Sequence, residues 1–361
     1  MSLSSPHGGD VWLVERALGL RAESVIDFSA NVNPYGPSPK AIRAVLDKVW
    51  MLSAYPDDEA KALKERLAER YGLKPSNFVV GNGSNEIIHM FSMLVAREGL
   101  VGVHIPTFSE YERAVTACGG KCLFTRPHVY DQPTVEELVE LMERGARALF
   151  LCNPNNPNGA VFRPKDVEEL LYEAHKRGVY VLLDEDYVEL ADEGSVRGFA
   201  SEVERFDRLA VLKSFSKGYG LAGLRVGYAI VNEGLAKRLE ALRVRWNVGL
   251  LAQEAAIAAL EDVEHVEAAK RLLRREKPRL VEELGSVGWL RPIYGYANFL
   301  LVELKERFRS PDLKAELARR GLLVRDCSNF RGLTDKYIRI AVKRPWENER
   351  LIRALKELSD N

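Results

Sequence analysis

The sequence carries no excess charge of either sign. Among its 361 residues, 52 Lys and Arg balance 52 Asp and Glu, so the formal net charge is zero. Proteins that bind nucleic acid or anionic membranes usually present a basic surface, because the partner's phosphates attract it. The composition therefore excludes a chain-wide attraction to either partner, and any site for an anion must be built from local groups.

Long apolar runs and targeting signals are also missing. No stretch approaches the roughly 20 apolar residues that span a bilayer. The first twelve residues, MSLSSPHGGDVW, lack the basic and then apolar order of a secretion signal. With 46% hydrophobic and 29% charged residues, the composition is typical of a folded globular protein. We therefore expect a cytoplasmic protein without a membrane partner.

Cysteine and glutamine are scarce. The close pair Cys118 and Cys122 has no second pair and no histidine at ligand spacing, and Cys152 and Cys327 lie far away. This spacing argues against zinc, so we expect no metal and four reduced thiols. Only two glutamines occur, whereas Arg and Glu are abundant, a balance typical of thermophilic proteins.

From about residue 78, short apolar runs alternate with amphipathic segments. The runs predict strands near 77–81, 100–106, 147–152, 179–184 and 208–214, and helices near 85–98, 109–120 and 165–178. Such alternation predicts an α/β fold with a mostly parallel, doubly wound sheet. Loops rich in Gly and Asn follow the strands, so they should gather at the carboxyl edge, where such sheets bind ligands.

The regular alternation of predicted strands and helices ends after about residue 246. One long helical region over 250–285 precedes apolar runs near 297–305, 322–330 and 337–343 and a final helix over 347–359. We expect a large domain over 36–245, a smaller α+β domain over 246–361, and an N-terminal arm over 1–35 that joins the small domain.

The stretch KSFSKGYGLAGLRVG, residues 213–227, has two competing interpretations. Gly218, Gly220 and Gly223 fit the dinucleotide-binding pattern G-x-G-x-x-G. That pattern should follow the first strand of the fold and open a helix. In this sequence the glycines follow at least four predicted strand–helix units, and the segment after them, LRVGYAIV, is predicted to be a strand rather than a helix. The dinucleotide interpretation is therefore rejected.

The alternative is that Lys217 condenses with an aldehyde cofactor. Ser214, Ser216 and Arg225 are donors suited to a phosphate. Other candidates follow separate strands: Gly83, Ser84 and Asn85 at a helix N-terminus, which favours anions; Phe108, able to stack on a ring; Asn156, able to bond a phenolic oxygen; and Asp184, able to hold a pyridine nitrogen protonated. Each alone is commonly structural, but together, on successive carboxyl-edge loops, they predict a pyridoxal 5′-phosphate site.

With these motifs in place, the sequence resembles the fold-type I pyridoxal-phosphate enzymes of the aspartate-aminotransferase class. GNGSNE, NPNNPNG, DEDY and SFSKGYGLAGLRVGY occur in that family's order and spacing, and the resemblance covers nearly the whole chain. It implies Lys217 as the lysine that joins the cofactor, Asp184 on the ring nitrogen, and Asn156 and Tyr187 on the ring oxygen. It also implies a homodimer in which Tyr55 reaches the phosphate of the other subunit, and Arg339 as the arginine for the substrate carboxylate.

Within the family, the resemblance narrows to enzymes of two reactions. The segments HGGD at 7–10 and IDFSANVNPYGPSP at 26–39 resemble threonine-phosphate decarboxylases of cobalamin biosynthesis, and LLVRDCSNFRGL agrees with them. We therefore expect decarboxylation of L-threonine O-3-phosphate to 1-amino-2-propanol O-2-phosphate. The alternative is a histidinol-phosphate aminotransferase. A ligand-sensing module without catalysis is disfavoured, because Lys217 and Asp184 are both present.

Both expected substrates carry a phosphate. A phosphate ester holds nearly two negative charges at neutral pH, more than Arg339 alone can neutralise if it binds a carboxylate. Arg325, His7 and Asn31 are our candidates for the remaining contacts, since they lie in segments expected to fold over the site.

Overall fold

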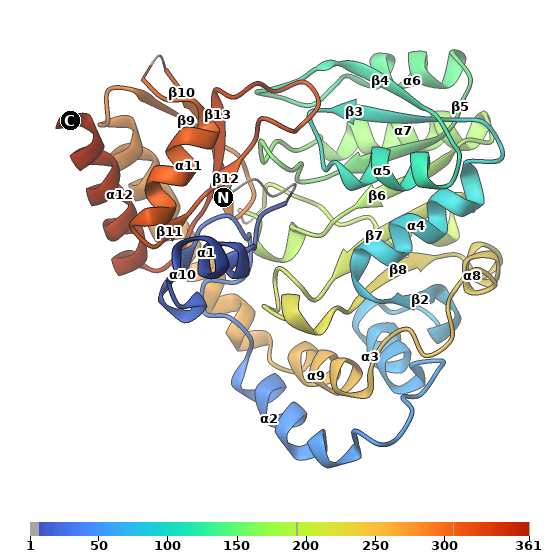
Figure 1. Ribbon diagram of the computed structural model, residues 1–361. Coiled ribbons are helices and arrows are strands. Elements are labelled where there is room, and N and C mark those ends of the chain that lie inside the picture. Colours follow the sequence, from blue (N-terminus) through green and yellow to red (C-terminus); the bar gives the residue numbers. More distant parts are fainter. Residues whose placement is uncertain (1–6, 193, 306, 361) are drawn as a thin grey trace.

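The computed structural model describes residues 7–192, 194–305 and 307–360. Within these ranges the strands form a seven-stranded sheet of order β2-β8-β7-β6-β5-β3-β4 (Figure 1). The strands are β2 (Phe78–Gly81), β3 (Leu100–Ile105), β4 (Cys122–Pro127), β5 (Ala146–Cys152), β6 (Tyr180–Asp184), β7 (Leu209–Ser214) and β8 (Gly227–Val231). Only β8 runs against its neighbours, so the α/β fold with a mostly parallel sheet is confirmed.

Helices cover both faces of this sheet because its strands are apolar on both sides. Along β5, Ala148 and Phe150 face one core, whereas Leu149 and Leu151 face the other. The first core packs under α4 (Gly83–Val95), α5 (Glu110–Ala117) and α8 (Glu233–Glu240), and the second under α3 (Lys61–Tyr71), α6 (Val135–Glu143) and α7 (Pro164–Lys176). Both faces of the sheet are therefore buried under helices, and the carboxyl edge of the sheet is not covered by them.

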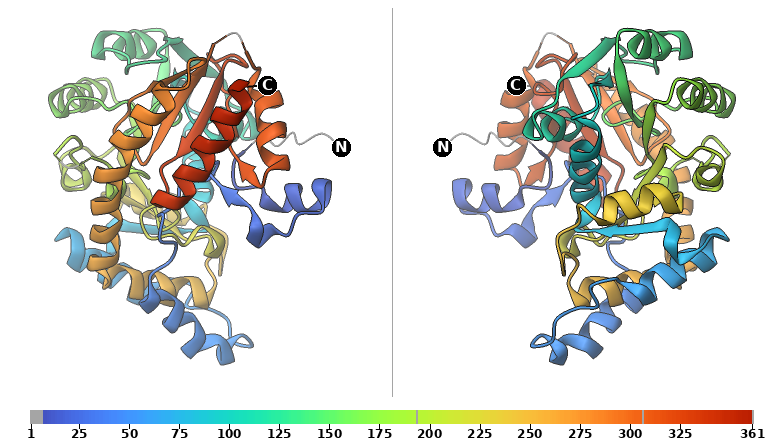
Figure 2. Two further views of the ribbon diagram at one scale, coloured as in Figure 1. Left: turned by 90° about the vertical axis from the view of Figure 1, so that its left-hand side faces the viewer. Right: turned by 90° about the vertical axis from the view of Figure 1, so that its right-hand side faces the viewer.

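A smaller antiparallel sheet lies beside that edge. It has the order β12-β13-β10-β9, from β9 (Leu290–Ile293), β10 (Phe299–Leu304), β12 (Arg325–Asp326) and β13 (Tyr337–Ala341). Its helices are α10 (Val263–Gly285), α11 (Ser310–Arg319) and α12 (Pro345–Asp360), and Figure 2 shows α10 and α12 side by side. No helix among the described residues combines the length and apolar character of a membrane span.

The N-terminal segment attaches to this smaller part of the molecule. It contains α1 (Val11–Leu18) and β1 (Ile26–Asp27), and β1 pairs in parallel with β11 (Leu322–Leu323). The chain then crosses to α2 (Pro39–Lys48), which packs on α9 (Leu250–Leu260). Within the predicted arm over 1–35, the described residue pair Ile26–Asp27 thus contacts the smaller part, while the domain boundaries stay a prediction.

The structure differs from the sequence expectation between α9 and α10. The single helical region over 250–285 is wrong, because α9 ends at Leu260 and α10 begins at Val263. Asp262, which precedes α10, has φ −101° and ψ 61°; this ψ lies outside the helical region, so the helix is interrupted there. The strand expected after the glycine-rich stretch is β8, so no long helix opens there and the dinucleotide interpretation finds no support.

Candidate active site

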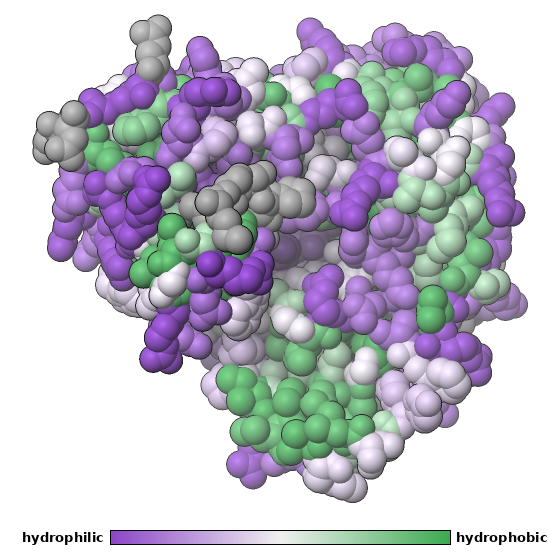
Figure 3. Space-filling view, viewed as in Figure 1, coloured by the Kyte–Doolittle hydropathy of each residue, from purple (hydrophilic) through white to green (hydrophobic). Residues whose placement is uncertain are grey.

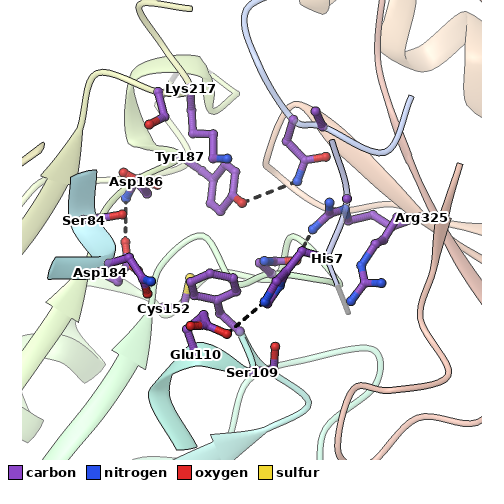
Figure 4. A pocket seen from close by; sticks show the side chains of 18 of the residues that line it. His7, Ser84, Ser109, Glu110, Cys152, Asp184, Asp186, Tyr187, Lys217 and Arg325 are labelled. Atoms are coloured by element: carbon purple, nitrogen blue, oxygen red, sulfur yellow. Dashed lines mark hydrogen bonds and ion pairs between the residues drawn. The ribbon is translucent and has the colours of Figure 1, made fainter. Parts of the chain in front are cut away.

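A cavity of about 300 Å³ lies between the carboxyl edge of the large sheet, the small sheet and the N-terminal arm (Figure 4). It collects predicted residues from nine separate segments of the sequence. Those lining it are His7, Asn31, Ser84, Asn85, Phe108, Asn156, Asp184, Tyr187, Ser216, Lys217, Arg225, Arg325 and Arg339. Residues more than 300 positions apart thus share one site.

Lys217 is held by the N-terminal arm as well as by its own loop. Asn33 donates its backbone N–H to the carbonyl of Lys217 at 2.9 Å, and its side chain donates to the carbonyl of Gly218 at 2.9 Å. Burial lowers the pKa of the Lys217 amine, and Asp186 opposes that shift. A lowered pKa increases the share of neutral amine, which is the form that attacks an aldehyde or accepts a proton.

Asp184 ends β6 at the floor of the cavity. The hydroxyl of Tyr111 donates to its Oδ2 at 2.5 Å, and the backbone N–H of Asp186 donates to its Oδ1 at 3.0 Å. Burial, followed by the nearby Asp186 carboxylate, raises the pKa of Asp184 to about 7. A buried carboxylate has lost its hydration, so a cationic partner such as a protonated ring nitrogen would stabilise its ionised form.

The N-terminus of α4 and Arg225 together fit a phosphate. Asn82 precedes α4 without capping it through its side chain, so the first N–H groups of the helix are left to bind an anion. Arg225 donates to Ser216 Oγ at 3.5 Å and lies so close that a Cβ on Gly83 would meet its Nη2 at 2.3 Å. Gly83 has φ +74°, a left-handed conformation that favours glycine, and a side chain there would displace the Arg225 guanidinium. Ser214 is buried at the end of β7, behind this cradle.

Tyr187, Asn156 and Phe108 surround the middle of the cavity. Asn31 donates to the Tyr187 hydroxyl at 3.4 Å, and the Tyr187 ring meets Phe299 edge to face at 5.1 Å. Burial raises the pKa of Tyr187, so its hydroxyl stays protonated and can donate. The donor set, with Asp184 below and a phosphate cradle beside it, fits pyridoxal phosphate.

Two arginines face this group from the small sheet. Arg325 on β12 and Arg339 on β13 are cross-strand partners and are both buried. Arg339 donates to the Ser29 carbonyl at 2.6 Å and to Asn156 Oδ1, while Arg325 donates to Asn329 Oδ1 at 2.7 Å. Burial, together with the neighbouring positive charge of Arg339, lowers the pKa of Arg325 to about 10.

His7 closes the mouth of the cavity. Its Nε2 lies 2.9 Å from Oε1 of Glu110, which also pairs with Arg113 at 3.2 Å (Figure 4). The hydrogen bond from His7 is the main reason that the pKa of Glu110 falls to about 2. This contact links the N-terminal arm to α5, across the site.

Three predicted residues are absent from the lining of the cavity: Gly83 and Ser214 lie close to lining residues in the sequence, whereas Tyr55 lies on the surface. Its side chain is 79% exposed, and its ring packs on Trp246 at 4.9 Å. The sequence interpretation also missed Asp186, Glu110 and Cys152, which line the cavity. Asp186 lies inside the motif DEDY and could have been noticed there, whereas Glu110 carried no signal beyond following a strand.

The sequence matches the family described as aminotransferase class I and II over residues 23–355. The chain belongs to this family. Its members use pyridoxal phosphate, so the cofactor predicted from the residues is confirmed, as is the fold-type I architecture. A curated relative, the histidinol-phosphate aminotransferase of Methanosarcina mazei, is 34% identical over 96% of this chain and 92% of its own length.

Solved structures agree with the fold. The histidinol-phosphate aminotransferase of Clostridium acetobutylicum has a TM-score of 0.85 at 27% identity, over 92% of this chain and 99% of that chain. The L-threonine-O-3-phosphate decarboxylase of Porphyromonas gingivalis has a TM-score of 0.82, also at 27% identity and with the same coverage. The backbone therefore does not separate the two reactions.

The curated relatives correct the expected reaction. Seven further relatives, at 28–37% identity, are named histidinol-phosphate aminotransferases too. The expectation of a threonine-phosphate decarboxylase is therefore wrong. It depended on three short segments, HGGD and IDFSANVNPYGPSP near the N-terminus and LLVRDCSNFRGL near the C-terminus. Residues of all three line the cavity, but they do not distinguish the two reactions.

Proposed function

We propose that this protein is a pyridoxal-phosphate-dependent aminotransferase that acts on histidinol phosphate, with 2-oxoglutarate as the amino acceptor. The observation that carries the proposal is the pair of buried arginines, Arg325 and Arg339, on neighbouring strands that line the cavity with Lys217. The curated relatives support the same reaction.

The arginine pair suits a substrate with a doubly charged group. Two guanidinium groups buried together repel each other; burial is the main cause of the lowered pKa of Arg325, and the charge of Arg339 adds to it. A phosphate ester, with nearly two negative charges, would balance both. In the second half of the reaction, the carboxylates of 2-oxoglutarate would take the same planar donors, because a guanidinium binds carboxylates and phosphates alike.

The residues around Lys217 suit proton transfer. When bound, pyridoxal phosphate supplies an electron sink for a bond broken at the carbon that carries the amine. In this proposal the neutral Nζ of Lys217 would take the proton from that carbon and would release it at a different atom, the former aldehyde carbon of the cofactor, because return to the same carbon would leave the amino group on the substrate. Asp184 would hold the ring nitrogen, Tyr187 and Asn156 the ring oxygen, and Ser84, Asn85, Ser214, Ser216 and Arg225 the phosphate.

The N-terminal arm would shield this chemistry from water. Asn31 reaches Tyr187, and His7 reaches Glu110, so the arm crosses the open side of the cavity at two points. Asn31 and His7 are therefore proposed to contact the substrate's phosphate-bearing end, together with Arg325. A cytoplasmic location stays part of this proposal.

We also propose that the active form is a homodimer. The side chains of Leu46, Trp50, Leu52 and Tyr55, on and after α2, are 60–79% exposed, and Figure 3 shows the apolar patch at the foot of the molecule. An exposed patch of this kind marks an association site. A second copy seated there would bring its Tyr55 toward the phosphate cradle, which this chain alone does not do.

Product analysis tests the reaction. Purified protein with pyridoxal phosphate would be offered histidinol phosphate and 2-oxoglutarate, and glutamate would be measured. Glutamate formed in step with histidinol phosphate consumed supports the proposal. A parallel mixture holds L-threonine O-3-phosphate alone; CO2 from it, with no glutamate from the first, would overturn the aminotransferase.

A further inference from the structure

The turn after β6 carries a second carboxylate that the proposed chemistry does not yet use. Asp186 follows Asp184 by two residues, is 7% exposed and lines the same cavity as Lys217. Its backbone N–H donates to Asp184 Oδ1 at 3.0 Å, so the turn holds the Asp184 carboxyl group against the backbone of Asp186. Figure 4 shows both on the same side of the pocket as Lys217.

One oxygen of Asp186 is left without a hydrogen bond. Its Oδ1 is buried, and none of the described residues is a hydrogen-bond partner for it. A buried carboxylate oxygen is costly unless a donor or a positive charge compensates it. Burial raises the pKa of Asp186, and the two groups that most oppose this are the Lys217 amine and the Ser214 hydroxyl.

Charged groups from several elements act on the Lys217 amine. Burial lowers its pKa, and Asp186 is the charge that raises it most; Arg339 and Arg225 lower it, and Asp184 raises it more weakly. Asp184 is already engaged by the Tyr111 hydroxyl at 2.5 Å. Asp186 is thus the carboxylate best placed to balance a positive charge on Lys217.

We propose that Asp186 is a positioning residue for Lys217, whose carboxylate stabilises the protonated lysine Nζ. When Nζ takes the proton from the substrate carbon, the electron pair of that C–H bond passes to the cofactor and the amine becomes ammonium. The adjacent carboxylate compensates the new charge in the buried cavity. When Nζ gives up the proton, the amine is neutral again. Asp186 neither gains nor loses a proton in these steps. The inference rests on the proposed role of Lys217.

Spectroscopic titration of the cofactor-loaded protein tests this role. The visible band of bound cofactor changes with the proton shared between Lys217 and the cofactor, and it should be absent from Lys217→Ala. Asp186→Asn keeps the shape of the side chain and removes its charge. We expect the pH midpoint of the band to fall by about one unit or more, because the opposite charge that favours protonation is gone.

A neighbouring residue supplies the matched control. Glu185 is equally buried but faces the other side of the sheet, where it pairs with Lys213 at 3.3 Å. Glu185→Gln should lower the melting temperature and leave the pH midpoint in place, which separates an electrostatic role from a structural one. Asp186→Glu, which restores the charge, should return the midpoint toward the wild-type value.

The outcomes are distinct. If Asp186→Asn cannot be loaded with cofactor, Asp186→Ala replaces it with the same expected shift. A midpoint that stays within about 0.3 units of wild type, in whichever variant loads, overturns the assignment of Asp186. No visible band in the wild-type protein overturns Lys217 as the cofactor lysine, and the role of Asp186 with it. The substrate assay is independent of both results.

Discussion

The hydroxyl of Tyr111 donates a hydrogen bond of 2.5 Å to Oδ2 of Asp184, 73 residues away in the sequence. Tyr111 lies on α5 and Asp184 ends β6, so the contact forms only when the helix packs on the sheet. The bond favours the ionised carboxylate and opposes the rise in pKa that burial causes. It therefore lowers the pKa of the carboxyl group that is proposed to hold the ring nitrogen.

Replacing Tyr111 with Phe should shift the pH dependence of cofactor association. Asp184, whose pKa is about 7, is ionised above that pH. Losing the Tyr111 donor should raise this pKa by about one unit, so rapid association should begin at higher pH than in wild type. The rate at which visible absorbance returns to apoprotein, measured across pH, reports the shift. Tyr71→Phe, which breaks a 2.8 Å contact with Tyr228 elsewhere, is the control and should leave the profile in place.

Glu110→Gln should cost stability only where Glu110 is charged. Because the pKa of Glu110 falls from 4.5 to about 2 on folding, its contribution is present above pH 4.5 and is lost as the pH falls toward 2. We expect a destabilisation on the order of 1 kcal/mol near pH 6. The gap in melting temperature from wild type should narrow as the pH falls from 6 to 3. A gap independent of pH contradicts this account.

Arg325→Ala should discriminate between phosphorylated and unphosphorylated substrates. A charge-assisted hydrogen bond is worth about 1.5–3 kcal/mol, so KM for histidinol phosphate should rise roughly 10- to 150-fold. KM for unphosphorylated histidinol should change far less. Steady-state kinetics on both substrates measure the split, and equal effects would remove Arg325 from the phosphate. Arg331→Ala, whose guanidinium pairs with Glu112 at 2.6 Å, should behave as wild type.

A charge placed in the apolar patch should dissociate the proposed dimer. Leu46 on α2 is 60% exposed, and Leu46→Glu would bury a carboxylate in the interface without a partner. Analytical ultracentrifugation should show a dimer for wild type and a monomer for the variant. Trp346 on α12 is 55% exposed but lies outside the patch, so Trp346→Glu should remain dimeric. A monomeric wild-type protein would contradict the homodimer.

The sequence alone determined the fold class and the sheet edge at which most of the proposed cofactor residues lie. Strand and helix patterns are local, and each cofactor residue follows a strand, so Lys217, Asp184, Asn156 and Ser84 were placed correctly at one sheet edge. The break between α9 and α10 was missed because both segments favour helix, α9 through its Ala and Leu and α10 through its Glu, Leu and Arg.

Only the tertiary structure decided how these residues act on one another. The contacts of His7 with Glu110, of Tyr111 with Asp184 and of Arg339 with Asn156 join segments that no local pattern connects. The reaction depends on which bond of the substrate stands perpendicular to the cofactor ring, and in the proposed function side chains from the arm and both sheets would fix that angle together. A short motif such as HGGD supplies residues to only one side of the cavity, and contacts on one side do not set the orientation of a substrate.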